Sequence, residues 1–135
     1  MPDFLMFTEG ANELLANGLP ATCTFELSTR QIGTGGTPLT AATTHAGGYG
    51  VATGTGYTSK TEAEPTPSNG SAAFAVKSWA TGAAVDWPAN VYSCIMRNAT
   101  SSKLICAWHL QPGGAGRAMN AANTTENFTP TLSLT

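Results

Sequence analysis

Two apolar runs that flank one short polar turn constrain the fold of this chain more than any other stretch. The runs Val91–Arg97 and Lys103–Leu110 are rich in residues that favour β-strands, and the turn Asn98–Ser102 between them is polar. Two such runs separated by a five-residue loop are typical of a β-hairpin. The segment Asp86–Leu110 therefore predicts a hairpin at the centre of the protein. It specifies how the chain folds and specifies no chemistry.

Pairing Arg97 with Lys103 places matched side chains on each face of this hairpin, because side chains alternate between faces with a period of two. The first face is large and aromatic, is expected to seed the core, and holds the pairs Met96–Leu104, Cys94–Cys106 and Tyr92–Trp108. The second face is smaller, is expected to meet a helix or another subunit, and holds the pairs Ile95–Ile105, Ser93–Ala107 and Val91–His109.

The composition indicates one domain with a polar but weakly charged surface. A chain of 135 residues can bury a core without metals or disulfides, so residues 1–135 are expected to form a single domain. Only 10% of the residues are charged, against about 25% in an average soluble domain. Such a surface is typical of proteins that pack in a larger assembly, and equally of a β-rich domain with many turns. The net charge of −2 and the scattered basic residues predict no binding to nucleic acid or to an anionic membrane.

The sequence shows no signal for membrane insertion or secretion. No apolar run approaches the ~18 residues of a membrane span, and the start MPDFLMFTEG lacks the basic region of a signal peptide. We therefore expect the protein to be made and kept in a cytosol. The cysteines Cys23, Cys94 and Cys106 fit buried thiols better than a disulfide framework. A Cys94–Cys106 bridge stays open, because the expected register places these residues directly opposite each other.

The N-terminal segment 1–18 predicts an apolar arm followed by a short helix. Thr8 can cap the helix, Glu9 lies in its positive first turn, and Gly18 supplies a stop. Phe4–Phe7 is either the first turn of this helix or an arm that packs on a neighbour. The apolar stripe of the helix is expected to consist of Ala11, Leu14 and Leu15.

The remaining chain is expected to form short strands joined by turns. Further strands are predicted at Thr22–Ser28, Tyr57–Glu62, Ser71–Trp79 and Phe128–Thr135. The stretch 30–56 is rich in glycine and threonine and lacks periodicity, and a loop of this length is uncommon unless it binds something or wraps a partner. The pattern predicts an all-β fold, an antiparallel sandwich or Greek-key barrel of about six to seven short strands with one short N-terminal helix.

No combination of residues matches a nucleotide site or a metal site. Gly33–Gly36 and Gly54–Gly56 resemble fragments of phosphate-binding loops, but neither has the lysine or the strand–loop–helix context that such loops need. The two histidines, His45 and His109, have no partners at zinc-ligand spacing. We therefore expect no cofactor and no metal.

Acidic and aromatic residues suggest two weaker alternatives. Glu62 and Glu64 are close in sequence, but beside a proline-rich corner they are better interpreted as solvated charges than as the acid–base pair of a glycosidase. We therefore expect no enzymatic activity. Trp79, Trp87 and Trp108 could line a carbohydrate-binding face, because aromatic rings stack on sugars. Trp108 belongs to the core face of the hairpin, which leaves Trp79 and Trp87 for such a role.

Five stretches together form a familiar layout. They are FTEGANELLANGL, GTGYTSKTEAE, SAAFAVKSWA, DWPANVYSCIMRNATSSKLICAWHL and NFTPTLSLT. In order and composition the chain resembles the small virion structural proteins of tailed bacteriophages, a group that contains capsid decoration (cement), head-fibre and tail-fibre-like proteins. The resemblance implies a β-sandwich or barrel that self-associates, often as a trimer, and binds a shell or tail lattice without catalysis.

The resemblance favours a capsid decoration protein that binds the lattice of the major capsid protein. It implies that the protein is made in the host bacterial cytoplasm and ends in the virion. A tail or tail-fibre-like subunit is the second interpretation and a carbohydrate-binding module the third. Decoration predicts intermolecular contacts from the segment Met1–Phe7 and the loop Ile32–Gly56. The residues expected to bind the partner are Phe4, Leu5, Phe7, Ile32, Leu39 and Tyr49.

Overall fold

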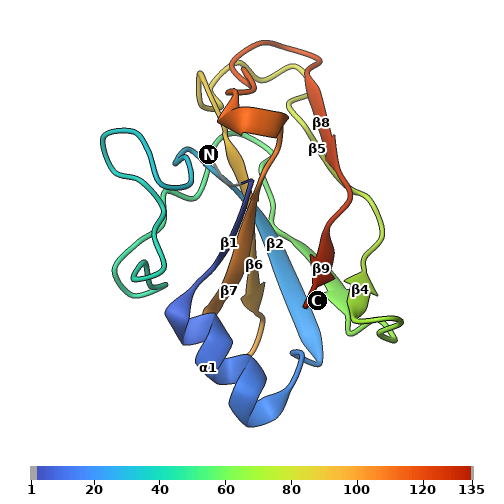
Figure 1. Ribbon diagram of the computed structural model, residues 1–135. Helices are drawn as coiled ribbons and strands as arrows, with labels where there is room; N and C mark the ends of the chain where they lie inside the picture. The colour runs from blue at the N-terminus through green and yellow to red at the C-terminus, as the bar shows by residue number, and fades with distance from the viewer. Residues whose placement is uncertain (1–2, 135) are drawn as a thin grey trace.

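The computed structural model describes residues 3–134 and confirms an all-β fold with one short N-terminal helix (Figure 1). Within these residues the chain forms more strands than the six or seven predicted, because the expected strand Ser71–Trp79 is broken in two and because Phe4–Met6 and Thr125–Phe128 form strands that were not expected. The elements are β1 (Phe4–Met6), α1 (Thr8–Asn17), β2 (Thr22–Ser28), β3 (Lys60–Ala63), β4 (Ser71–Ala73), β5 (Lys77–Ala80), β6 (Ser93–Asn98), β7 (Leu104–His109), the 3-10 turn η1 (Pro112–Gly114), β8 (Thr125–Phe128) and β9 (Thr131–Ser133).

The main sheet has five antiparallel strands in the order β1-β7-β6-β2-β3. Its central pair is the predicted hairpin, β6 and β7. The sheet is open, with β1 and β3 at its edges, so the observed architecture is sandwich-like rather than a closed barrel. The segment Phe4–Met6, expected as a helical turn or a free arm, is instead the edge strand that pairs with β7.

The second layer is a two-stranded ribbon that covers one face of the main sheet (Figure 1). β4 pairs with β9 and β5 pairs with β8, and the backbone bond from Phe74 N–H to Pro130 O continues the ladder between the two pairs. The strand predicted over Ser71–Trp79 is therefore interrupted, and the interruption changes which side chains point inward. Phe74 and Trp79 are both buried although they are five residues apart, a spacing that an unbroken strand does not allow.

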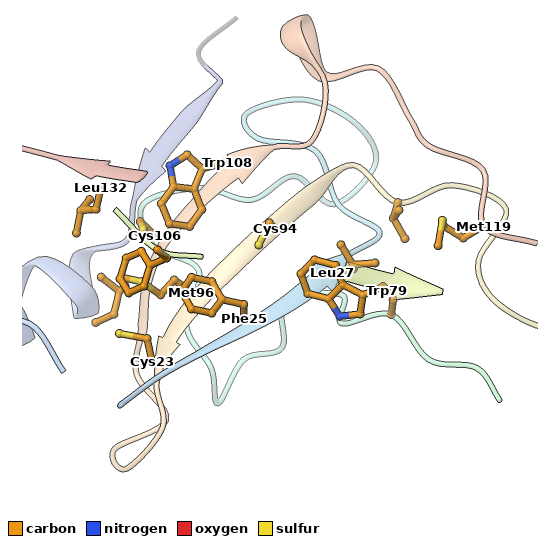
Figure 2. Close-up of a cluster of buried hydrophobic side chains, with 14 of the residues drawn as sticks. Cys23, Phe25, Leu27, Trp79, Cys94, Met96, Cys106, Trp108, Met119 and Leu132 are labelled. Carbon is orange, nitrogen blue, oxygen red and sulfur yellow. The ribbon is translucent and has the colours of Figure 1, made fainter. Parts of the chain in front are cut away.

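The main core lies between the ribbon and the sheet (Figure 2). Phe25 of β2 and Met96 of β6 lie at its centre, and Phe25 packs edge-on against Phe74 with 5.0 Å between ring centroids. Edge-to-face packing at this distance is favourable for aromatic rings. The prediction that the aromatic face of the hairpin seeds the core is confirmed by Cys94, Met96, Cys106 and Trp108, all of which belong to this cluster.

The register of the hairpin differs from the predicted one. Met96 pairs with Cys106 and Cys94 pairs with Trp108, so each of these partners lies two residues further along β7 than expected. A β-bulge at Ile105 then lets Arg97 face Leu104. Leu104 was predicted on the core face and Ile105 on the second face. Because of the bulge, the two are exchanged: Ile105 joins the main core, and Leu104 packs on the opposite face.

The cysteines are buried free thiols, as the odd number suggested. Cys94 and Cys106 are not opposite each other in the observed register, so the bridge that stayed open does not form. Burial raises the pKa of Cys23 to about 11 and raises the pKa of Cys106 well above its ordinary value. The three thiols therefore act as small apolar side chains of the core.

The helix α1 ends where predicted but begins and packs differently. Gly18 adopts a positive φ of 73° and donates its N–H to Leu14 O, which closes the helix. Phe7 occupies the N-cap position in place of Thr8. The predicted stripe is wrong at Leu15, which is 88% exposed. The helix instead packs through Gly10, whose missing Cβ lets it lie directly on the backbone of Ile105.

Candidate partner-binding surface

The six residues expected to bind a partner lie mostly in the interior. The second face of the main sheet carries a smaller core cluster, here called the loop core, which is formed by Leu5, Phe7, Ile32, Leu39, Tyr49, Ile95, Leu104 and Ala107. Five of the six expected residues belong to it, and Phe4 packs on Trp108 at the edge of the main core. Met1 and Pro2 of the expected contact segment lie outside the described residues.

The loop core explains what the long loop does inside the chain. The loop that begins at Arg30 lies along one face of the sheet (Figure 1), where the side chains of Ile32, Leu39 and Tyr49 are at most 7% exposed. Ile32 and Leu39 are held together by a short parallel bridge. These side chains are therefore occupied within the chain, and a partner can reach only the outer surface of the loop.

Beneath the loop lies a buried polar group that the sequence did not reveal. Glu26 of β2 is 5% exposed; it accepts a hydrogen bond from Tyr49 Oη at 2.8 Å and an ion-pair contact from Arg97 Nε at 2.5 Å. Burial, together with the neighbouring Glu26 carboxylate, raises the pKa of Tyr49, so its hydroxyl stays a donor. Alternation in the strand Thr22–Ser28 places Glu26 on the face opposite Phe25 and Leu27, and nothing local in the sequence shows that a distant loop covers that face.

A second acidic residue fastens the loop to the helix and the sheet. Oε1 of Glu9 accepts backbone N–H bonds from Leu104 at 2.8 Å and from His45 at 2.9 Å, and Thr8 N–H donates to Ala41 O. Glu9 was predicted to stabilise the positive first turn of the helix, and its carboxylate lies there. His45 itself is exposed and packs its ring near Tyr49, with 5.6 Å between ring centroids.

His109, by contrast, is buried and bonded at both ring nitrogens. Its Nε2 accepts the N–H of Ile32 at 3.0 Å, and its Nδ1 lies 3.1 Å from Asp3 Oδ1. Asp3 also accepts the N–H of Gly113. The hydrogen bonds from His109 and from Gly113 hold the pKa of Asp3 below its ordinary value. The arrangement joins Asp3, β7 and the start of the loop.

The two glutamates considered as an acid–base pair have separate roles. Glu62 reaches across from β3 to the ribbon, where it pairs with Lys77 Nζ at 2.5 Å and accepts the N–H of Ala75 at 3.0 Å. Ala75 lies at the interruption between β4 and β5, so Glu62 satisfies a donor that the ladder leaves free. Lys77 is 6% exposed, with its ammonium 5.0 Å from the centroid of the Phe25 ring. Glu64 is exposed and takes no part in this clamp.

The tryptophans offer no stacking face for a sugar within residues 3–134. Trp79 is 1% exposed and Trp87 is 3% exposed. Their indole N–H groups donate to backbone oxygens of the chain, from Trp79 to Thr58 O and from Trp87 to Thr55 O. The expectation that these two rings were free of the core is wrong, and the route to carbohydrate binding through them is lost.

Other site chemistry can be checked directly in the described part of the chain. Among residues 3–134 there is no group of three or more His, Cys, Asp or Glu side chains placed to hold a metal ion. Over the same residues, no helix is long and apolar enough to cross a membrane.

The surface that remains for a partner is the outside of the loop. From Gln31 to Ser59 the sequence contains no Asp, Glu, Lys or Arg. The residues whose side chains lie on the outside of this segment are mostly exposed small or polar ones: Gly33, Thr37, Thr40, Ala41, Ala42, His45, Ala46 and Gly48. The uncharged run can be read from the sequence, but only the structure shows that its first part, with Ile32, Leu39 and Tyr49, covers the second face of the sheet, whereas Ala52 and Tyr57 pack on the main core.

A separate apolar groove lies on the ribbon side of the molecule. It has a volume of about 230 Å³ between the end of α1 and the β4–β9 pair, and its apolar lining includes Leu14, Leu19, Pro67, Leu132 and Leu134. Leu134 is 63% exposed there.

Comparison of the chain with protein families, with curated proteins and with solved structures finds no match.

Proposed function

We propose that this chain is a non-enzymatic structural protein of a bacteriophage virion, and specifically a capsid decoration protein that binds the assembled head and stabilises it. The observation that carries the proposal is the outer surface of the loop over residues 31–50, here called the loop face, which contains no Asp, Glu, Lys or Arg of its own and beside which the Arg30 guanidinium is bonded to Gly48 O. The centres of protein–protein interfaces are depleted of charged residues. A folded domain with such a face is suited to lie against another protein surface.

The anchoring of the loop supports the same proposal. Binding through a disordered segment loses free energy because the segment must be ordered. Here the loop is already fixed by Ile32, Leu39 and Tyr49 in the loop core and by the bonds to Glu9. The loop face is therefore preorganised, so most of the contact energy is available for binding.

A lattice can turn a modest contact into effective stabilisation. A protein that binds the assembled shell better than its free subunits shifts the equilibrium toward the shell by mass action. If the chain self-associates, several identical contacts act together on a symmetric lattice, and their combined affinity exceeds that of one contact. No bond-making chemistry is required of the chain.

Sedimentation with purified phage parts tests the proposal. Heads and tails of the phage that encodes the chain are prepared separately and incubated with the purified protein. We expect the protein to sediment with heads and to remain in solution with tails. Binding to tails alone would replace decoration with the tail or tail-fibre-like role. Binding to neither part would contradict a virion role for the chain.

A charge-insertion variant tests whether the loop face makes the contact. The double substitution Thr37→Glu and Ala42→Glu places two charges on the exposed loop face, and we expect head binding to fall at least roughly tenfold, because desolvating an unpaired charge is unfavourable. The matched control is Thr66→Glu with Ala83→Glu, the same replacements at exposed sites outside that face. Equal binding by both variants would contradict the assignment of the interface.

A further inference from the structure

His109 fixes the start of the long loop through a bond that a neutral imidazole alone can make. The N–H of Ile32 is a donor only, and it points at Nε2 of His109 over 3.0 Å. Nε2 must therefore carry a lone pair, and the ring proton belongs on Nδ1, which faces Asp3 Oδ1 at 3.1 Å. The side chain of His109 is 0% exposed, so water does not replace either partner.

We infer that His109 is a pH-sensitive latch: mild acid protonates Nε2, breaks its bond to Ile32 and releases the start of the loop from the sheet. Two donors cannot share one hydrogen bond, so an imidazolium at this position leaves the buried N–H of Ile32 without an acceptor. The state with the loop in place takes up no proton at Nε2, and the released state does. By linkage, the latch is therefore stable at neutral pH and weakens as the pH falls.

The groups that face the His109 ring from each neighbouring element can be named. Asp3, which directly precedes β1, is the charged side chain that contacts the ring. From the loop, Arg30 directs its guanidinium to Gly48 O. From β6, the neighbour of His109 is Ser93, whose hydroxyl donates to Arg30 O. At η1, the backbone N–H of Gly113 donates to the same Asp3 Oδ1 that faces the ring.

On the same face of the sheet, Arg97 and Glu26 are paired with each other, and Glu9 accepts backbone N–H bonds. A change between about pH 8 and about pH 5 spans the titration of an ordinary imidazole. Carboxylates such as Asp3 keep their charge through most of this range. A response confined to it can therefore be assigned to a histidine.

Release of Ile32 frees more than one bond. Ile32 is 2% exposed in the loop core and forms the bridge to Leu39. The residues on either side of Ile32 are bonded to Leu39 as well, because Leu39 N–H donates to Gln31 O and Gly33 N–H donates to Leu39 O. The stretch 31–39 is thus expected to open as a unit. The latch does not depend on the proposed virion role, and it would change the shape of the loop face whatever partner that face binds.

Nuclear magnetic resonance on the full chain tests the latch. Amide hydrogen exchange and the ring nitrogen shifts of His109 are measured at several values from about pH 7.5 to about pH 5, with each exchange rate divided by its intrinsic rate. We expect the Nδ1–H tautomer at the upper end and a loss of protection at Ile32 of roughly tenfold at the lower end. Amides of β6, such as Ile95, should keep their protection.

Two matched variants assign the response. His109→Gln can accept from Ile32 and donate to Asp3 without titrating, so protection at Ile32 should become independent of pH. His45→Gln removes the exposed histidine of the same loop and should keep the wild-type response. Unchanged protection at Ile32 down to about pH 5 would overturn the latch, as would equal loss throughout β6. If His109→Gln does not fold, the wild-type titration decides alone.

Discussion

At the scale of single residues, one buried and two half-buried carboxylates connect elements that are distant in sequence. Glu62 joins β3 to the ribbon, Glu26 joins β2 to the loop, and Glu9 joins the helix to both β7 and the loop. Each carboxylate accepts at least two bonds. Their positions explain why so few charges are left on the surface of a protein that has few to begin with.

The clamp at Glu62 gives the sharpest test of this role. Replacing Glu62 with alanine leaves Lys77 buried without its counter-ion and Ala75 N–H without an acceptor. Removing one partner of a buried pair is strongly destabilising, so we expect Glu62→Ala to lower the free energy of unfolding by about 3 kcal/mol. Glu64→Ala changes the same residue type at an exposed site two positions away and should stay within about 0.5 kcal/mol. Guanidinium denaturation measures both, and equal losses would contradict the clamp.

Residue-level prediction from the sequence succeeded where the environment is local and failed where it is not. The alternation in Thr22–Ser28 correctly indicated that Phe25 and Leu27 are buried. It gave no sign that Glu26 is buried too, because the loop that covers it comes from a separate part of the chain. In the same way, Trp79 and Trp87 were left as surface candidates, although the backbone oxygens that accept their indole N–H groups lie over twenty residues away in sequence.

At the scale of elements, the main errors come from irregularities inside predicted strands. The bulge at Ile105 exchanged two faces of the hairpin, and the interruption after Ala73 divided one predicted strand into β4 and β5. A strand pattern has a period of two, so one extra residue reverses every assignment beyond it. The existence of the hairpin and of a strand within Ser71–Trp79 was predictable from apolar alternation. The bulges were not, because they depend on what the partner strand and the opposite layer offer.

The contact between α1 and the sheet depends on one glycine. In an exposed helix, Gly→Ala usually stabilises by up to about 1 kcal/mol. At Gly10 the added Cβ would overlap the backbone of Ile105, so the helix would have to move away. We expect Gly10→Ala to destabilise the protein by about 2 kcal/mol, as overpacking does. Asn12→Ala, at an exposed position of the same helix, is the control. Thermal unfolding followed by circular dichroism compares them, and a stabilised Gly10→Ala would contradict the close contact.

At the scale of the whole molecule, the chain is a sandwich-like all-β fold whose second face is covered by its own long loop. The sequence predicted the fold class and the length of this loop. It also singled out apolar residues of the N-terminal segment and of the loop as partner-binding residues. In the structure five of these six residues pack against one another in the loop core. Deleting Met1–Phe7 is therefore a poor test of partner binding, because it removes β1 and the buried Phe7.

Self-association is a property of the whole molecule that solution scattering can measure. The resemblance to small phage structural proteins implies self-association, often as a trimer, and we predict a trimer here. Light scattering combined with small-angle X-ray scattering should then give a compact particle of about three times the 13.8 kDa mass of one chain. A single-chain mass at all concentrations tested would contradict the trimer and would leave lattice binding to one chain at a time.

The central claim, that this chain is part of a virion, is tested most directly by measuring how much of it purified virions contain. Quantitative mass spectrometry of virions from the phage that encodes the chain should find it in a fixed ratio to the major capsid protein. The ratio should stay constant through repeated density-gradient purification. If the chain is abundant in infected cells but absent from the purified virions, the proposed function is wrong.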